Sequence, residues 1–158
     1  MPLRSRACWK VRHMTSAALV VGCGKLKVWK AKPWLGAVPA KDVYIGPLFR
    51  LCRRYAEMHY ASDWFILSAF YGLVVPEQEL LDYDVTFNGL NSSVIDRDRL
   101  SKQSAALLDR YEVIVSLAGK AYNEQLRRAL PSSKVLELPL QSKSLFERMK
   151  WLKAATTP

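Results

Sequence analysis

The sequence predicts one domain of the α/β class over residues 15–158, preceded by a basic N-terminal arm over residues 1–14. Four apolar runs typical of buried strands alternate along the chain with amphipathic segments typical of helices. Each apolar run ends in a loop rich in Gly, Lys, Ser, Tyr or Pro. Because such alternation favours a parallel sheet, we expect three α/β/α layers around a central four-stranded parallel sheet, with the strand ends along one rim.

The expected elements follow one another as strand and helix, with a long loop after the second strand. The strands are expected at residues 16–21, 64–68, 112–117 and 134–138. The helices are expected at residues 47–59, 96–109, 122–130 and 145–153. Pro47 suits the first turn of the first helix, and Pro131 ends the third. The loop over residues 82–91 lacks the periodicity of either element, and we expect it to face a ligand.

Charge and composition restrict the class of partner. The 158 residues include 24 Lys and Arg against 14 Asp and Glu, which gives a net charge of +10. This charge indicates a polyanionic partner, and we favour nucleic acid or a nucleotide over an anionic membrane. No apolar run approaches the roughly eighteen residues that a membrane span needs. Cys8, Cys23 and Cys52 show no paired spacing, which fits a reducing, cytoplasmic protein without a zinc site.

The end of the first strand carries a possible phosphate site. Gly22 and Gly24 allow a tight turn, and Lys25 and Lys27 follow directly, although the same pattern occurs in ordinary strand-to-loop turns. The next loop mixes aromatic residues with lysines over residues 28–40. Such a loop can stack on bases beside phosphate contacts, or its two tryptophans can clamp it to the body.

The stretch over residues 63–84 predicts a second part of the rim. A buried strand runs into the small and polar residues 68–72, which we expect to form the floor of a site. Asp82 and Asp84 follow within about ten residues of the helix- and strand-breaking Pro76. Ligands of open α/β sheets bind outside the carboxyl ends of the strands, so the two acids are candidates for catalysis. The alternative is a strand with a solvated acidic loop.

The remaining rim residues favour anion binding and exclude histidine chemistry. Lys120 lies at a predicted helix N-terminus, where backbone N–H groups attract anions. His13 and His59 fall outside the rim loops, and Cys23 has no histidine nearby to activate it. What remains is carboxylate, amide and ammonium chemistry beside aromatic rings. These groups suffice to hydrolyse an N-glycosidic bond, whose transition state resembles an oxocarbenium ion.

Several motifs at joint spacing support a family resemblance. They are residues 23–27, 44–49, 67–73, 83–84 and 117–122. Over residues 17–152 the chain resembles a family of small bacterial and phage proteins of formerly unknown function, similar to the uracil-DNA glycosylase superfamily. Some members resemble antiphage DNA glycosylases that remove glucosylated hydroxymethylcytosine from T-even phage DNA. The resemblance implies a glycosylase fold and a base-excising hydrolase that leaves an abasic site, without a cofactor or metal.

The chain departs from the uracil enzymes at both of their main motifs. Cys23-Gly24-Lys25 stands where those enzymes have a Gly-Gln-Asp-Pro loop, and it brings no carboxylate. Residues 138–142 replace their His-Pro-Ser loop and bring no histidine. The acid must therefore come from elsewhere, and we choose Asp84 first and Asp82 second. A glucosylated base also needs hydrogen-bonding groups, for which the candidates are Asn88, Asn91, Asn123 and Gln141.

The predicted site has three groups of residues. The candidate catalytic residues are Asp84, Asp82 and Asn123. The candidate base-pocket residues are Cys23, Gly24, Ser68, Tyr71, Asn88, Tyr122 and Gln141. The candidate phosphate-binding residues are Lys25, Lys27, Lys120, Lys143 and Ser142. Two other functions stay open: a hydrolase of free nucleotides or nucleosides, and a nucleic-acid-binding module without catalysis.

Overall fold

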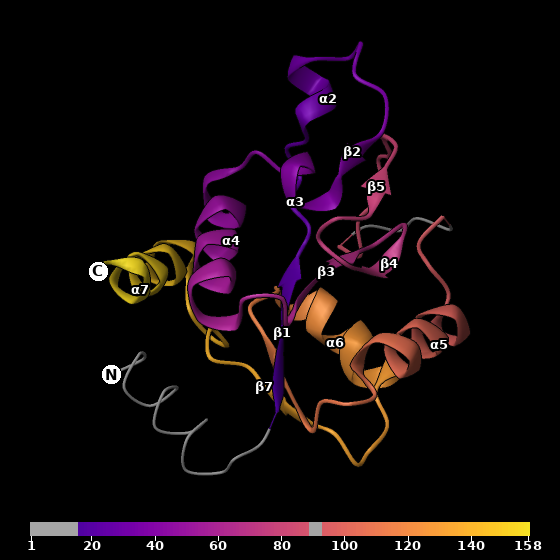
Figure 1. The fold of residues 1–158 in the computed structure, drawn as a ribbon, viewed down its shortest axis with the longest axis vertical. Helices are drawn as coiled ribbons and strands as arrows, with labels where there is room; N and C mark the ends of the chain where they lie inside the picture. The colour runs from indigo at the N-terminus through magenta and orange to yellow at the C-terminus, as the bar shows by residue number, and fades with distance from the viewer. Residues whose placement is uncertain (1–15, 89–92) are drawn as a thin grey trace.

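A five-stranded, mostly parallel sheet forms the centre of the protein (Figure 1). The computed structural model describes residues 16–88 and 93–158. The strands lie in the order β4-β3-β1-β6-β7, in which β3, β1, β6 and β7 are parallel and β4 is antiparallel. Their bounds are β1 Ala17–Gly22, β3 Trp64–Ser68, β4 Gly72–Val74, β6 Val113–Ser116 and β7 Val135–Glu137. The protein therefore has a mixed α/β fold.

Helices cover both faces of the sheet and make three layers (Figure 1). On one face, α4 (Pro47–Tyr60) packs against α7 (Leu145–Thr156). On the other face, α5 (Arg97–Leu108) packs against α6 (Lys120–Ala129). Each of these four helices begins within two residues of its predicted start, because apolar periodicity and proline positions mark these segments clearly.

The central strand β1 divides the core into two clusters. Ala17, Leu19 and Val21 pack with the α4 and α7 face, whereas Ala18 and Val20 pack with the α5 and α6 face. All five are buried, because a strand between two parallel neighbours is covered on both faces. Each buried valine or leucine contributes about 1.5–3 kcal/mol to folding. The free energy that holds β1 in place also positions the loop that follows it.

The four predicted strands are present and parallel to one another. The predicted number of strands in the sheet is wrong, because the sheet has five. The fifth strand, β4, pairs antiparallel with β3 through a tight turn, in register Ser68 to Gly72. The Ser68 hydroxyl accepts hydrogen bonds from the backbone N–H groups of Phe70 (3.2 Å) and Tyr71 (3.1 Å). Gly72 has a φ of +78°, which permits the chain to reverse. Residues 68–72 therefore form a hairpin turn.

An extension lies above the carboxyl ends of the strands and forms the upper part of the molecule in Figure 1. It was not predicted, because its elements are only two to four residues long. They are α2 Val28–Ala31, β2 Val38–Pro39, α3 Ala40–Val43 and β5 Glu79–Leu80. β2 and β5 pair antiparallel. The backbone N–H groups of Ala40 and Lys41 donate to the carbonyls of Gln78 (2.8 Å) and Pro76 (2.9 Å), which fastens the extension to the chain after β4.

Two predictions fall outside the described residues: the basic arm over residues 1–14 and the amide candidate Asn91. Within residues 16–88 and 93–158, no helix is both long enough and apolar enough to cross a membrane.

We predict that Gly72→Ala destabilises the fold by about 2–4 kcal/mol. A Cβ at this position would overlap the side chains of Gln103 and Ile95 on a backbone with positive φ. Gln103 cannot move freely, because its side chain accepts from Leu73 N (2.9 Å) and donates to Tyr71 O (2.8 Å). Urea unfolding of this variant measures the loss. Gly36→Ala is the matched control, since nothing lies near its added methyl group. Equal midpoints for the two variants would contradict the prediction.

Candidate functional site

The sheet topology places a crevice at the carboxyl end of β1. The chain leaves β1 through α4 to reach β3 on one side, whereas β6 lies on the other side. The loops after β1 and β6 therefore diverge, and ligands of open α/β sheets bind at such a switch point. A cavity of about 440 Å³ lies here, between residues 22–26 and 117–119. The two loops touch at Gly22, where a Cβ would lie 3.1 Å from Cβ of Ala118.

Basic groups and helix N-termini line this crevice. Gly46 and Gly119 are the N-cap residues of α4 and α6, and neither helix has a side-chain cap that would occupy its first N–H groups. Lys25 lies on one side of the crevice, and Arg148 reaches it from α7. Arg148 is oriented by a hydrogen bond from its Nε to the Lys143 carbonyl oxygen (3.0 Å). The crevice is thus suited to a negatively charged group.

A short chain of hydrogen bonds forms one wall of the crevice. The Cys23 thiol donates to Tyr122 Oη at 3.3 Å, and Tyr122 Oη lies 3.3 Å from Thr86 Oγ1. The ring of Phe87 packs edge-on against Tyr122, with 4.8 Å between centroids. Burial, reinforced by the negative charge that an ionised Cys23 would carry, raises the pKa of Tyr122 to about 12. Tyr122 is therefore a neutral hydrogen-bonding group at physiological pH.

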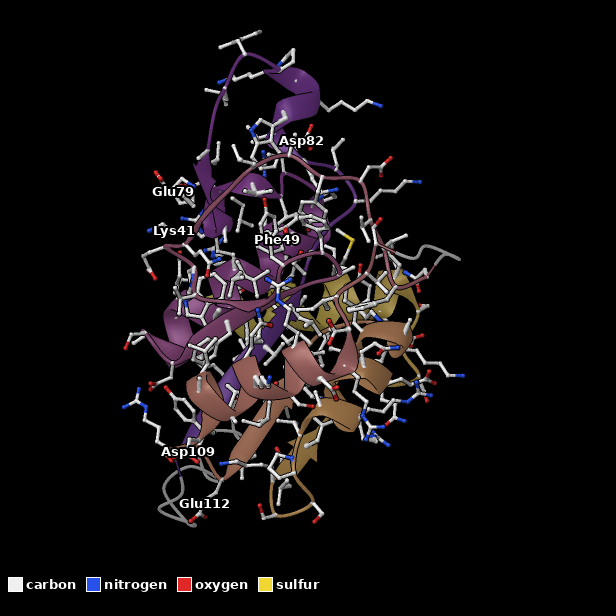
Figure 2. All side chains as sticks on the ribbon, turned by 90° about the vertical axis from the view of Figure 1, so that its right-hand side faces the viewer. Lys41, Phe49, Glu79, Asp82, Asp109 and Glu112 are labelled. Carbon is white, nitrogen blue, oxygen red and sulfur yellow. The ribbon has the colours of Figure 1, made fainter. Side chains whose placement is uncertain are left out.

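A second hollow contains the two predicted acids. Asp82 and Asp84 line a space of about 560 Å³ together with Lys25, Lys27 and Lys30. Trp29 and Tyr83 also line it, together with Leu26. The two hollows are neighbours, because residues 25 and 26 line both. Figure 2 places Asp82 near the extension, whereas the acids Asp109 and Glu112 lie at the opposite end of the molecule.

Tyr83 anchors the loop that carries the two acids. Its hydroxyl oxygen lies 2.5 Å from that of Tyr44, and it also hydrogen bonds to the Ser68 side chain. Its ring stacks on Phe70, and Lys27 Nζ lies 4.5 Å from the ring centroid. Burial raises the pKa of Tyr83 far above the usual value for a phenol. With Tyr83 fixed inside, its neighbours Asp82 and Asp84 are exposed to solvent.

A third hollow of about 400 Å³ holds the candidates from the later loops. It is lined by Lys120, Asn123, Gln141 and Ser142, among others. Asn123 is buried, and both ends of its amide are used within the chain. Its Oδ1 accepts from Ser116 Oγ (2.6 Å), and its Nδ2 donates to the Ala118 carbonyl oxygen (3.0 Å). The side chain thus stabilises the turn between β6 and α6.

The predicted rim is therefore three adjacent hollows along one edge. Cys23, Gly24, Asn88 and Tyr122 line the crevice, Lys27 and both acids line the second hollow, and Lys25 lines both. Ser68 and Tyr71 instead make hydrogen bonds within the chain. Tyr71 Oη bonds to both the N–H and the carbonyl of Leu81 at 3.0 Å, and the bonds of Ser68 are those of the hairpin turn. Lys143 contributes its backbone to the orientation of Arg148. Within the described part of the chain, no three His, Cys, Asp or Glu side chains gather as a metal site would require.

Some residues of the site were not predicted. Tyr44 and Tyr83 both lie in the quoted motifs, yet their contact joins positions 39 residues apart and has no periodic signal. Thr86 belongs to the loop that was expected to face a ligand. Arg148 was assigned to an ordinary helix, and only the packing of α7 against α4 brings it to the crevice.

The fold and the hollows together define an α/β protein with a basic, hollowed surface at the carboxyl edge of its sheet. The chain belongs to a family of unknown function (DUF6884), whose model matches residues 18–154. It is also similar to the uncharacterized protein YfjM of Bacillus subtilis strain 168. The two are 33% identical over 125 residues, which cover 78% of this chain and 83% of that protein.

We predict that Tyr122 contributes stability that disappears at alkaline pH. Its pKa is about 12 in the folded protein against 10.0 for an unperturbed tyrosine. Between these values the unfolded chain loses the proton first, so the free energy of unfolding falls as pH rises. The fall from this one group is at most about 1.4 kcal/mol per pH unit.

Urea unfolding at several pH values from 9 to 12 measures this effect. The variant Tyr122→Phe keeps the ring and removes the titrating group, so its stability should fall less over that range. Tyr44 and Tyr83 remain in both proteins, and burial is the main cause of the raised pKa of each, so their contribution to the pH dependence changes little in the variant. Identical pH profiles for the variant and the parent would refute the assignment.

Proposed function

We propose that this protein is a DNA glycosylase that hydrolyses the N-glycosidic bond of a modified cytosine and leaves an abasic site. The proposed base is glucosylated hydroxymethylcytosine in phage DNA that has entered the cytoplasm, so the biological role would be antiphage defence. The observation that carries the proposal is the pair Asp82 and Asp84 in a lysine-lined hollow beside the switch-point crevice. Carboxylates for the sugar and cations for the phosphates are thus next to each other.

The chemistry proposed for the hollow is carboxylate catalysis. Asp84, and Asp82 as the second choice, would activate a water molecule or stabilise the positive charge that develops on the deoxyribose. Lys25 and Lys27 would hold the flanking phosphates and leave the carboxylates free to face the sugar. Both acids are exposed before DNA binds, and the DNA itself would exclude water from them.

The crevice is the proposed pocket for the extruded base. Its volume of about 440 Å³ falls within the range of pockets for small ligands, about 300–1,000 Å³. Cys23, Asn88 and Tyr122 offer hydrogen-bonding groups along its wall. A glucosylated base is large and polar, and it needs both this room and these groups.

The proposal extends to a uracil-DNA glycosylase-like fold. It is supported by the positions of the motifs that carry the resemblance. Residues 23–27 follow β1, residues 67–73 join β3 to β4, and residues 117–122 join β6 to α6. All three lie at the carboxyl edge of the sheet, where glycosylase chemistry would take place.

The first test supplies the purified protein with three DNA preparations. One is phage DNA that carries glucosylated hydroxymethylcytosine, one is phage DNA with unglucosylated hydroxymethylcytosine, and one is unmodified DNA. Abasic sites are scored with an aldehyde-reactive probe, and released bases are identified by mass spectrometry. We expect abasic sites in the glucosylated DNA alone. Equal inactivity on all three would rule out the proposed reaction.

The second test concerns the acid. Asp84→Asn should lower the rate of base release about 10²- to 10⁴-fold, because it removes the group that activates water or stabilises charge. DNA binding should persist or become tighter, since a negative charge is lost. Glu79→Gln removes an exposed carboxylate from the same segment that lies outside the hollow, and it serves as the control. Undiminished release by Asp84→Asn would transfer the role to another residue.

A hydrolase of free nucleotides is the alternative with an observation in its favour. The crevice combines Arg148, Lys25 and two uncapped helix N-termini, which suits the single phosphate of a mononucleotide. Release of base from a nucleoside monophosphate, with DNA left intact, would favour this alternative. Tight DNA binding without any product would instead favour the non-catalytic module.

A further inference from the structure

The extension separates two tryptophans that the sequence places in one loop. Trp29 is 4% exposed, and its indole Nε1 donates to the Gly36 carbonyl oxygen at 2.9 Å. This bond closes the loop onto α2. Trp34 lies within the closed loop and is 74% exposed. One tryptophan therefore clamps the loop, whereas most of the other faces solvent.

The exposed indole belongs to the part of the molecule that projects farthest beyond the sheet edge. In Figure 1 the segment between α2 and β2 forms the top of the molecule, above the carboxyl ends of the strands. The Trp29 clamp and a hydrogen bond from the backbone N–H of Leu35 to the Lys32 carbonyl oxygen (3.1 Å) shape this tip. A large apolar ring is thus presented on a folded loop, where it gains little from burial and is available to stack on a partner.

The charges around the ring identify the partner by complementarity. Between residues 25 and 41 the chain contains lysines and no acidic residue. Lys30 in the last turn of α2 and Lys32 just after this helix are both exposed. Lys30 also lines the hollow of Asp82 and Asp84. An exposed aromatic face among ammonium groups is the arrangement with which proteins bind single-stranded nucleic acid, because the ring stacks on a base while the lysines contact phosphates.

We propose that the tip over residues 28–37 is a nucleic-acid-binding element in which Trp34 stacks on an unpaired base and Lys30 and Lys32 contact the flanking phosphates. The inference rests on the nucleic-acid partner of the proposed function and not on its catalytic step. Since Trp29 and Lys30 of the tip also line the hollow of the acids, a strand held at the tip would lie close to that hollow.

The test measures binding of a single-stranded oligodeoxythymidylate of about 12 nucleotides at low salt. Trp34→Ala should weaken binding about 5- to 150-fold through the loss of one stacked base. Trp34→Phe should retain most of the affinity, because an aromatic face remains. Phe146→Ala is the matched control, since Phe146 is 75% exposed on α7. Binding should also quench tryptophan fluorescence in the parent, and this quenching should be mostly absent in Trp34→Phe.

The lysines are tested through the salt dependence of the same binding reaction. Lys30→Gln combined with Lys32→Gln should reduce the slope of log affinity against log salt by about 1.4, which corresponds to two phosphate contacts on a single strand. Lys150→Gln combined with Lys153→Gln removes the same charge from exposed positions of α7 and should leave the slope unchanged.

Each outcome decides the inference separately from the glycosylase proposal. Equal affinities for Trp34→Ala and Phe146→Ala would overturn it, as would an absence of DNA binding by the parent. The inference would also be overturned if the protein bound phosphatidylserine vesicles through Trp34 while its binding to DNA did not depend on Trp34. Binding to DNA that depends on Trp34, without base release from any DNA, would support the inference and reject the glycosylase. Full base release by Trp34→Ala, with unweakened binding to DNA, would reject the inference and support the glycosylase.

Discussion

The burial of β1 is the constraint on which the rest of the structure depends. β1 pairs on both sides and is covered on both faces, so its carboxyl end cannot move without disturbing the whole sheet. The loop after it, from Gly22 to Leu26, lines two of the three hollows. Cys23 N also donates to the carbonyl oxygen of Leu67 at 3.0 Å, which continues the pairing with β3 past the end of the strand. The backbone at the start of the crevice is thus tied directly to the central sheet.

A second constraint is the buried contact between Tyr44 and Tyr83. The two hydroxyls meet 2.5 Å apart beneath the extension, and Ser68 ties them to the end of β3. A hydroxyl pair buried in this way needs its partners, since an unpaired polar group inside a protein costs about 1–3 kcal/mol. The motif residues around Tyr44 and around Tyr83 therefore act together. Tyr44 supports the loop of Cys23 and Gly24, and Tyr83 supports the loop of the two acids.

The parts of the fold that could be predicted are those with local, repeated signals. The strand Trp64–Ser68 was predicted with its observed bounds, because an apolar run begins after Asp63 and ends at the polar Ser68. α4 begins at Pro47 as expected. β4 could not be predicted, since it has three residues and its turn depends on Gln103 from the distant α5. Short elements stabilised by remote side chains leave no periodic pattern.

The candidate site shows the same division. The sequence placed both acids and the lysines of the loop after β1 along one edge. The parallel strand β1 brings the lysines there, whereas the acids reach the same hollow through β5 of the small antiparallel sheet. It could not distinguish a side chain that faces a ligand from one that is used within the chain. Asn123 and Tyr71 carry the right polar groups, yet Ser116, Ala118 and Leu81 already occupy them. Such a distinction depends on contacts that form only when the turns are folded.

The small sheet of β2 and β5 has a mechanical consequence. The loop with Trp34 leads into β2, and the chain that leaves β5 reaches Asp82 two residues later. Both segments are therefore attached to the same two-stranded unit. The hydrogen bonds from Ala40 and Lys41 and the buried Tyr83 hold this unit and the acidic loop against the body of the protein. The spacing between the tip and the carboxylates is thus set by the fold, and a polymer that contacts both would meet them at that fixed spacing.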